Sequence, residues 1–122
     1  MLRNKFYRTL STDKQTINEI ESQVLINIDD PIFKGHFPEV PVVPGVCMLQ
    51  MIKEQLEDRL GSPLQLVKAG NLKFLSVINP LENPELSISI SYRKSDDGFI
   101  NADASITYSD KVFFKLAKAI YR

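Results

Sequence analysis

Only one stretch of the chain has the periodicity of a long helix, and this limits the folds open to it. From residue 44 to residue 60, apolar side chains recur at a period close to 3.6, at Val46, Leu49, Ile52, Leu56 and Leu60. Pro44 fits the first helical position, and Gly61 followed by Ser62-Pro63 ends the helix. The first two turns are apolar nearly all round and are expected to be buried on most sides, whereas the second half is amphipathic and is expected to reach solvent.

The end of the chain predicts antiparallel strands. Residues 85–94 and 101–108 each alternate apolar and polar side chains, which is the period of a half-buried strand. Asp97-Gly98 lies between them and favours a hairpin turn. Residues 111–122 predict a last strand.

Three further strands are expected. Residues 64–78 predict a longer strand in which Gly70 permits a bulge or a close backbone approach. Residues 20–28 predict a strand in the first half, and residues 5–10 a weaker one. One buried helix followed by strands suggests an antiparallel β-sheet wrapped around one long central α-helix.

Composition limits both the size and the chemistry. A chain of 122 residues, 43% hydrophobic and 25% charged, fits a single soluble domain over residues 1–122. The 15 basic and 15 acidic side chains balance, so no electrostatic footprint for nucleic acid stands out. One cysteine, one histidine and no glycine-rich phosphate loop predict neither a metal site nor a nucleotide site. With no membrane-span or signal-peptide pattern, the expected location is the cytoplasm.

The only histidine, His36, lies in a proline-rich segment, GHFPEVPVVPGV, at residues 35–46. Prolines at a spacing of three favour an extended, polyproline-like path that would hold His36 at a fixed place relative to the helix start. There, the N–H groups of Gly45, Val46 and Cys47 lack intrahelical acceptors and form a positive pole, suited to an oxygen that gains negative charge. With an unperturbed pKa of about 6.5, His36 is a natural base near neutral pH.

This segment resembles the G-H-F-P-x-x-P-x-x-P-G-V signature of the 3-hydroxyacyl-acyl-carrier-protein dehydratases of the FabZ and FabA type, which adopt the hotdog fold. The resemblance continues in AGNLKFLSVINPLENPELSISI, residues 69–90, with a glycine, a basic residue and a phenylalanine ahead of a proline loop and an alternating strand. It covers residues 29–92 well and the rest by strand pattern only. It implies an α+β hotdog fold.

The resemblance also implies an activity. The enzyme would remove water from a 3-hydroxyacyl thioester, giving a trans-2-enoyl thioester in fatty-acid or related acyl-chain biosynthesis. His36 would take the C2 proton. The residues expected around the substrate are Gly45, Val46, Gly70, Phe37 and Phe74. No cofactor is expected, since the acyl chain arrives on the phosphopantetheine arm of an acyl-carrier protein.

One position departs from the family pattern. The family has Glu or Asp fourteen residues after the histidine, and this chain has Gln50. Glutamine can hold a hydroxyl or a water but has no proton to deliver, and losing a general acid costs about 100- to 10,000-fold. Two carboxylates are candidate substitutes: Glu54, about 6 Å further along the helix axis, and Glu39 in the proline loop.

Simpler explanations exist for the same residues. A lone histidine is most often a surface residue, and Gln50 could be a buried amide bonded to backbone or to a partner subunit. The proline spacing could serve as a peptide ligand, although the apolar helix that follows disfavours it. Cys47 is expected to pack in the core, and Met48 and Met51 to line the core or a substrate tunnel.

A second chain is expected because one helix cannot cover the sheet and also bury its own apolar sides. The resemblance implies a homodimer, with His36 of one chain facing Gln50 of the other, and possible larger assemblies. The implied partner is an acyl-carrier protein, with Lys34, Lys68 and Lys73 as candidate contacts. Two alternatives remain: a non-catalytic hotdog subunit that binds the carrier or pairs with an active paralogue, favoured by Gln50, and another thioester enzyme such as a thioesterase.

Overall fold

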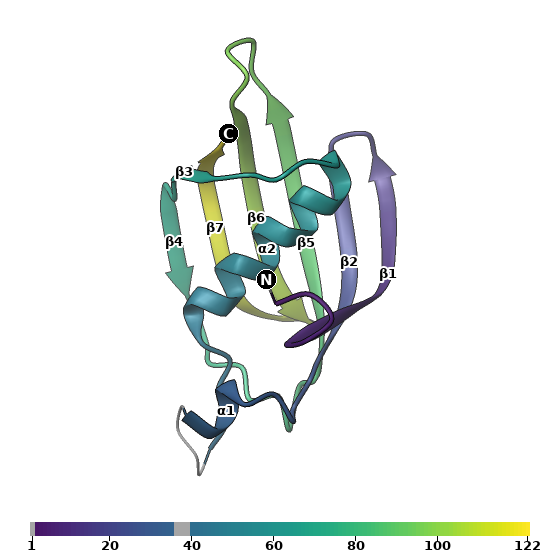
Figure 1. The fold of residues 1–122 in the computed structure, drawn as a ribbon, viewed down its shortest axis with the longest axis vertical. Helices are drawn as coiled ribbons and strands as arrows, with labels where there is room; N and C mark the ends of the chain where they lie inside the picture. The colour runs from purple at the N-terminus through teal and green to yellow at the C-terminus, as the bar shows by residue number, and fades with distance from the viewer. Residues whose placement is uncertain (1, 36–39) are drawn as a thin grey trace.

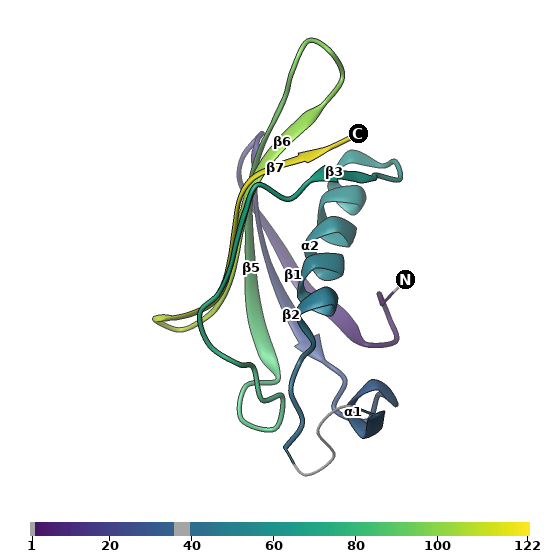
Figure 2. The same cartoon turned by 90° about the vertical axis from the view of Figure 1, so that its left-hand side faces the viewer.

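The structure is a computed structural model that describes residues 2–35 and 40–122. It contains a seven-stranded sheet in the order β1-β2-β5-β6-β7-β3, with β4 also paired to β7. The elements are β1 (Tyr7–Thr16), β2 (Glu19–Ile26), α1 (Ile32–Gly35), α2 (Gly45–Leu60), β3 (Leu66–Lys68), β4 (Asn71–Phe74), β5 (Glu85–Lys94), β6 (Ile100–Tyr108) and β7 (Lys111–Tyr121). All the strand pairs named in this order are antiparallel. Helix α2 lies along one face of the curved sheet (Figures 1 and 2), so the expected sheet around a central helix is confirmed.

The core lies between α2 and the sheet. Met51, Ile52 and Leu56 of α2 are fully buried, as are Ile88 and Ile106 of the central strands. Each fully buried side chain of this size stabilises the fold by about 1.5–3 kcal/mol, before entropy is counted. The alternation seen in the sequence places these strand residues on the helix side, which confirms the half-buried strands.

The long strand expected over residues 64–78 is interrupted. It forms β3 and β4, which both pair with β7, and the break falls opposite the bulge that β7 forms in its pairing with β6. Gly70 lies at this break with φ of 69°. A Cβ there would approach the carbonyl oxygens of Ala117 and Lys118 to 2.3 and 2.4 Å, so the close backbone approach expected at Gly70 is confirmed.

The ends of α2 agree with the sequence to within one residue. The helix begins at Gly45, and Pro44 is the N-cap, with extended ψ of 145°, instead of the first helical residue. Gly61 is the C-cap in the left-handed conformation, and its N–H donates to the Glu57 carbonyl at 2.8 Å. The glycine stop signal is therefore confirmed.

The second half of α2 reaches solvent as expected, at the exposed Asp58, but two features of the helix were not expected. In the second half, Glu54 is 0% and Gln55 4% exposed, because the N-terminal segment and β1 supply hydrogen bonds to both. In the first half, Val46 is 76% exposed in this single chain. The apolar first turns therefore have one side that the rest of the described chain does not cover.

Two features near the N-terminal half were not expected. Strand β1 runs to Thr16, well past residue 10, and pairs with β2 through two register shifts. The short helix α1 begins after Asp30, whose side chain accepts the Ile32 N–H at 2.9 Å. No helix of the described residues is long and apolar enough to cross a membrane.

Candidate functional site

The structure describes five of the seven residues expected at the site. His36 and Phe37, together with the alternative acid Glu39, lie outside the described residues. The five described residues are Gln50, Gly45, Val46, Gly70 and Phe74. They lie on α2, on β4 and at the β3–β4 break.

Gly45 and Phe74 are in direct contact across the start of the helix. The Phe74 ring leaves no room for a side chain at position 45, since a Cβ there would lie 2.6 Å from the tip of the ring. Phe74 is itself 55% exposed and packs on the buried Phe114, with ring centroids 5.1 Å apart. The glycine of the signature therefore allows an aromatic ring to lie against the helix start.

An apolar pocket of about 340 Å³ opens beside this contact. It is lined by Val43, Gly45, Met48, Phe74, Leu75, Ser76 and Val77. Gln50, Val46 and Gly70 do not line it. An apolar pocket next to the positive end of a helix suits an acyl chain whose polar head group lies at the helix start.

The open N–H groups at the helix start are fewer than expected. The Cys47 N–H donates to the Pro44 carbonyl at 3.0 Å, so the expectation that it is open was wrong. Gly45 and Val46 have no backbone acceptor within residues 2–35 and 40–122. The positive pole available to a ligand thus consists of these two amides.

Gln50 lies one turn along α2 and is half-buried. Its Nε2 donates to Oε2 of Glu54 at 2.7 Å, across the i, i+4 spacing of the helix. Glu54 is therefore the immediate neighbour of the residue that replaces the family's acid.

The Glu54 carboxylate is saturated with donors. It accepts four hydrogen bonds, from the Leu2 N–H, the Arg3 N–H, the Tyr7 hydroxyl and the Gln50 amide. Burial acts to raise the pKa of this carboxyl, but these hydrogen bonds outweigh it and hold the pKa below its usual value. A buried carboxylate held ionised in this way is poorly suited to deliver a proton, which weighs against Glu54 as the substitute acid.

Sequence reasoning missed the N-terminal side of this cluster. Leu2, Arg3 and Tyr7 are about fifty positions from Glu54, and no local pattern marks them as its partners. The i, i+4 spacing of Gln50 and Glu54 was the one available signal.

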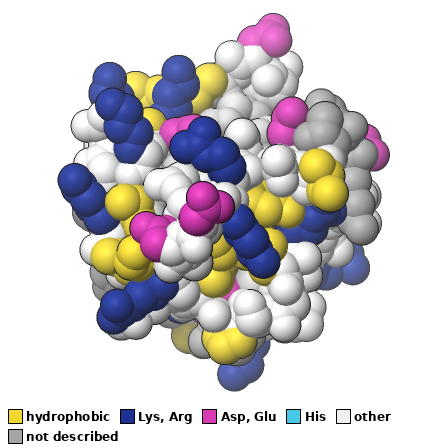
Figure 3. Space-filling model, turned by 90° about the horizontal axis from the view of Figure 1, so that it is seen from above, with side chains coloured by type: hydrophobic (Ala, Val, Ile, Leu, Met, Phe, Trp, Pro, Cys, Tyr) yellow, Lys and Arg dark blue, Asp and Glu magenta, His cyan; other side chains and the backbone are white. Residues whose placement is uncertain are grey.

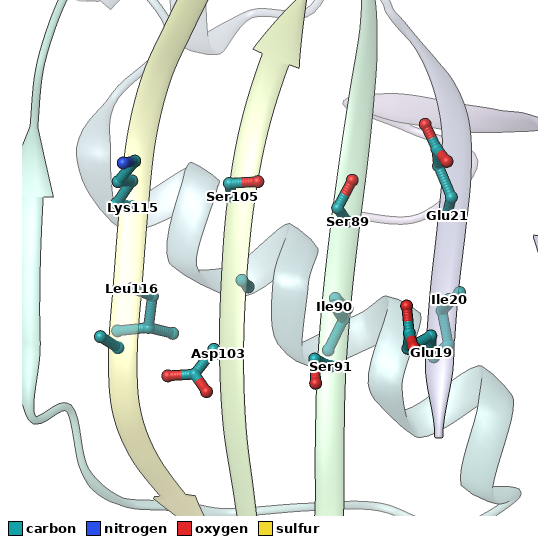
Figure 4. A pocket seen from close by; sticks show the side chains of 12 residues that line it. Glu19, Ile20, Glu21, Ser89, Ile90, Ser91, Asp103, Ser105, Lys115 and Leu116 are labelled. Carbon is teal, nitrogen blue, oxygen red and sulfur yellow. The ribbon is translucent and has the colours of Figure 1, made fainter. Parts of the chain in front are cut away.

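A larger hollow, of about 390 Å³, lies on the sheet face away from α2 (Figure 4). A row of polar side chains crosses four paired strands there, from Glu21 through Ser89 and Ser105 to Lys115. None of the five described site residues lines it. This hollow is separate from the predicted site.

The candidate lysines for a carrier protein are exposed but scattered. Lys34 is on α1, near the lower end in Figure 1, and Lys68 is on β3, in the upper half of that view, while Lys73 on β4 is in register with Lys115. Seen from above the view of Figure 1, Lys and Arg side chains are spread among acidic and neutral ones (Figure 3). These views do not single out one docking patch. Within the described chain no group of three His, Cys, Asp or Glu residues is placed to hold a metal ion.

Comparison of the sequence with known families gives a dehydratase match. A profile described as ApeI dehydratase, of the ApeI-like type, matches residues 12–110. The 3-hydroxyacyl-acyl-carrier-protein dehydratase FabZ of Chlamydia caviae is 31% identical over 108 residues, which cover 81% of this chain and 70% of that protein. FabZ of Oceanobacillus iheyensis is 26% identical over 103 residues, which cover 70% of this chain and 74% of that protein.

Comparison of the structure gives the same fold. A chain of the dehydratase heterocomplex ApeI:P from Xenorhabdus doucetiae superposes with a TM-score of 0.68, covering 93% of this chain and 96% of that one at 15% identity. An uncharacterized protein from Erwinia carotovora subsp. atroseptica gives a TM-score of 0.59, covering 93% and 91% at 19% identity. The expected hotdog fold is confirmed.

Proposed function

The chain belongs to the family of ApeI-like dehydratases, and from that premise we propose that it removes water from a 3-hydroxyacyl thioester carried on an acyl-carrier protein. The product is the trans-2-enoyl thioester. The observation that carries the proposal is the apolar pocket at the start of α2, where Gly45 and Phe74 meet beside two amides without a backbone acceptor among the described residues. We assign the pocket to the acyl chain and the amides of Gly45 and Val46 to the thioester carbonyl.

His36 acts as the base in this proposal. It takes the proton from C2, the electrons of that bond form the C2–C3 double bond, and the C3–O bond breaks. Negative charge that gathers on the thioester oxygen is stabilised at the helix start, where loss of one such donor typically costs about 100- to 1,000-fold in rate. Phe37, Val46 and Gly70 retain the substrate-binding roles that the family resemblance assigns to them.

Gln50 has no proton to give, so the leaving hydroxyl receives its proton from the imidazolium of His36. The atoms balance: the proton taken from C2 leaves with the hydroxyl as water. Because general acid catalysis contributes about 100- to 10,000-fold, we expect a slower enzyme than relatives that have an acid at this position. No cofactor takes part in the proposed reaction.

We further propose that two copies of the chain form the active unit, with His36 of one chain facing Gln50 of the other. The support is the uncovered apolar side of the helix start, with Val46 76% and Val77 71% exposed. Strand β4 has one pairing partner within the described residues, β7, so its other edge is available to a second chain. An acyl-carrier protein in the cytoplasm is the proposed partner for substrate delivery.

The test is hydration of a trans-2-enoyl thioester on a carrier protein by the native chain and by His36→Ala. The expected result is turnover by the native chain and none by the variant. Asp29→Asn changes an exposed carboxylate seven positions before His36 in the sequence; it is the control and is expected to keep native turnover. Turnover that survives in His36→Ala would contradict the proposal.

A second candidate is a non-catalytic subunit that pairs with an active hotdog chain. The amide at position 50 favours it, and one structurally similar chain comes from a dehydratase heterocomplex. It requires that the native chain alone is inactive, still binds the carrier protein, and gains activity when a hotdog chain with Glu or Asp at this position is added. Steady release of free thiol from acyl substrates would instead indicate a thioesterase.

A further inference from the structure

The Gln50 amide is held with its nitrogen toward Glu54. Nε2 donates to Glu54 Oε2 at 2.7 Å, and an ionised carboxylate can only accept hydrogen bonds. If the amide flipped, its own oxygen would lie against that carboxylate, so the flipped orientation is excluded. Its carbonyl oxygen, Oε1, is therefore the end left for another partner.

Glu54 is itself fixed, which makes this orientation a stable one. The Leu2 N–H donates to Oε2 at 2.9 Å, and the Arg3 N–H and Tyr7 hydroxyl donate to Oε1 at 2.8 and 3.1 Å. The Arg3 guanidinium also donates to the Glu54 backbone carbonyl at 3.2 Å and pairs with Asp58 at 3.0 Å. The Leu2 and Arg3 N–H groups and the Tyr7 hydroxyl thereby hold both oxygens of the carboxylate in place.

We propose that Glu54 is a positioning residue that turns the Gln50 carbonyl oxygen toward the acyl substrate, where it accepts a hydrogen bond from the 3-hydroxyl group. The inference rests on the proposed function and deepens it. Gln50 then recognises the hydroxyl as a donor, and it does not act as a donor itself.

A specificity follows from this orientation. A 3-hydroxyacyl chain offers a proton to Gln50 Oε1, whereas a 3-oxoacyl chain offers only an acceptor, which repels it. One net hydrogen bond of this kind corresponds to about a tenfold difference in affinity. The site therefore selects the hydroxy over the oxo form of the same chain.

The first test measures binding of two unreactive analogues, 3-hydroxyacyl- and 3-oxoacyl-pantetheine amides, to the full chain. The native chain is expected to prefer the hydroxy analogue by about tenfold. Glu54→Gln removes the obligate acceptor, frees the Gln50 amide to turn, and is expected to reduce the preference to less than threefold. Equal preference in the native chain and Glu54→Gln would overturn the proposal.

Two further variants separate positioning from structure. Gln50→Ala leaves the other Glu54 contacts in place and is expected to lose only the preference for the hydroxy analogue. Adding Glu54→Gln to Gln50→Ala is expected to change this preference no further. Glu57→Gln makes the same chemical exchange on the same helix, at a carboxylate that accepts the Leu64 N–H at 2.7 Å. This control is expected to keep the native preference. A further loss in the double variant would indicate a structural role and overturn the assignment.

A second readout does not depend on turnover. In protein labelled with 15N-glutamine, the Gln50 side-chain amide, assigned by its loss in Gln50→Ala, is expected to exchange slowly in the native chain and several-fold faster in Glu54→Gln. An amide that exchanges equally fast in both proteins would overturn the proposed orientation. A third outcome separates the two proposals: the exchange rates differ between the native chain and Glu54→Gln, and the native chain has the tenfold preference, but no turnover is measured. In that case the proposed dehydratase activity fails and the binding role of Gln50 stands.

Discussion

The two ends of helix α2 contrast in how completely the chain itself covers them. At the open end, defined here as Gly45, Val46, Phe74, Leu75 and Val77, large apolar side chains are exposed around an apolar pocket. The opposite situation holds at the closed end, where Glu54 and Gln55 are almost fully buried. Hydrogen bonds from the N-terminal segment and β1 satisfy these two side chains there.

At the closed end a single chain satisfies its own buried side chains, whereas at the open end it leaves apolar surface that a ligand or a second copy can cover. Buried polar groups of the closed end have their partners within the chain, which is the usual state of a protein interior. The apolar surface of the open end is what a monomer seldom leaves in water without a function. Gln50 lies between the two ends of the helix. Its amide is hydrogen-bonded to Glu54 of the closed end, and it is one helical turn from Val46 of the open end.

The largest expected effect is at the break between β3 and β4, four residues before Phe74 of the open end. Gly70→Ala combines a positive φ with a clash against two backbone oxygens, so we expect the free energy of unfolding to fall by about 3 kcal/mol. Gly61→Ala is the matched control, because Gly61 has a similar φ of 73° but nothing within 4 Å of the added Cβ. That control is expected to cost about 1 kcal/mol. Equal losses in denaturant unfolding would show that the close approach at Gly70 is unimportant.

The second-largest expected effect is a gain of activity on substitution of Gln50, which lies between the two ends. Gln50→Glu places a carboxyl beside the buried carboxylate of Glu54, so the two share one proton and the apparent pKa of the new group rises. A carboxyl that stays protonated near neutral pH is a general acid, and we expect about 100-fold faster dehydration, falling as pH rises through the raised pKa. The double variant Gln50→Glu/Glu54→Gln lacks the repelling charge, so the pKa of its new carboxyl is lower. As pH rises, its activity is expected to fall at a lower pH than that of the single variant. Identical pH profiles for the single and double variants would contradict this account.

A smaller loss is expected at the closed end. Tyr7→Phe removes the hydroxyl that donates to Glu54 and accepts from Gln55, and a hydrogen bond to a charged group contributes about 2 kcal/mol to unfolding free energy. Tyr121→Phe is the control, since the buried Tyr121 hydroxyl has no hydrogen-bond partner within the described chain. Denaturant unfolding is expected to show little change for the control. A Tyr121→Phe loss as large as that of Tyr7→Phe would remove the distinction.

The smallest effect on the isolated chain, and an informative one, is at the open end. Val46→Asp introduces a charge on an exposed position, so monomer stability is expected to change by less than about 0.5 kcal/mol. If a second copy covers this surface, the dimer dissociation constant rises at least about tenfold, because the charge is desolvated in the interface. Sedimentation analysis at several concentrations measures this. Unchanged association would place the interface elsewhere.

Much of the fold followed from local pattern. The alternation through Ile88, Ile90 and Ile106 identified the central strands, and Gly61 identified the end of the helix. At Gly70 the sequence predicted a bulge or a close backbone approach but not the break in the strand, because the residues that approach it belong to β7, far away in the chain. Burial of Glu54 was missed for the same reason, since its partners come from residues 2–7 and a charged side chain in an amphipathic pattern is normally exposed.

For the candidate site, the sequence identified the residues but not their orientation. The signature placed Gly45 at the helix start, and the structure adds that Phe74 lies against it. The sequence identified Gln50 as a departure from the family pattern. It did not show which end of the amide faces outward, because that depends on hydrogen bonds that hold Glu54 from the N-terminal segment.

The central claim, that a second copy completes a dehydratase site, is tested most directly by subunit complementation. His36→Ala and Gln50→Ala chains are mixed through reversible dissociation and assayed for hydration of the enoyl thioester, next to each variant alone. If His36 and Gln50 of one site come from different chains, the mixed dimer contains one intact site, and activity is expected to rise well above that of either variant. Activity equal to the average of the two variants would contradict the claim.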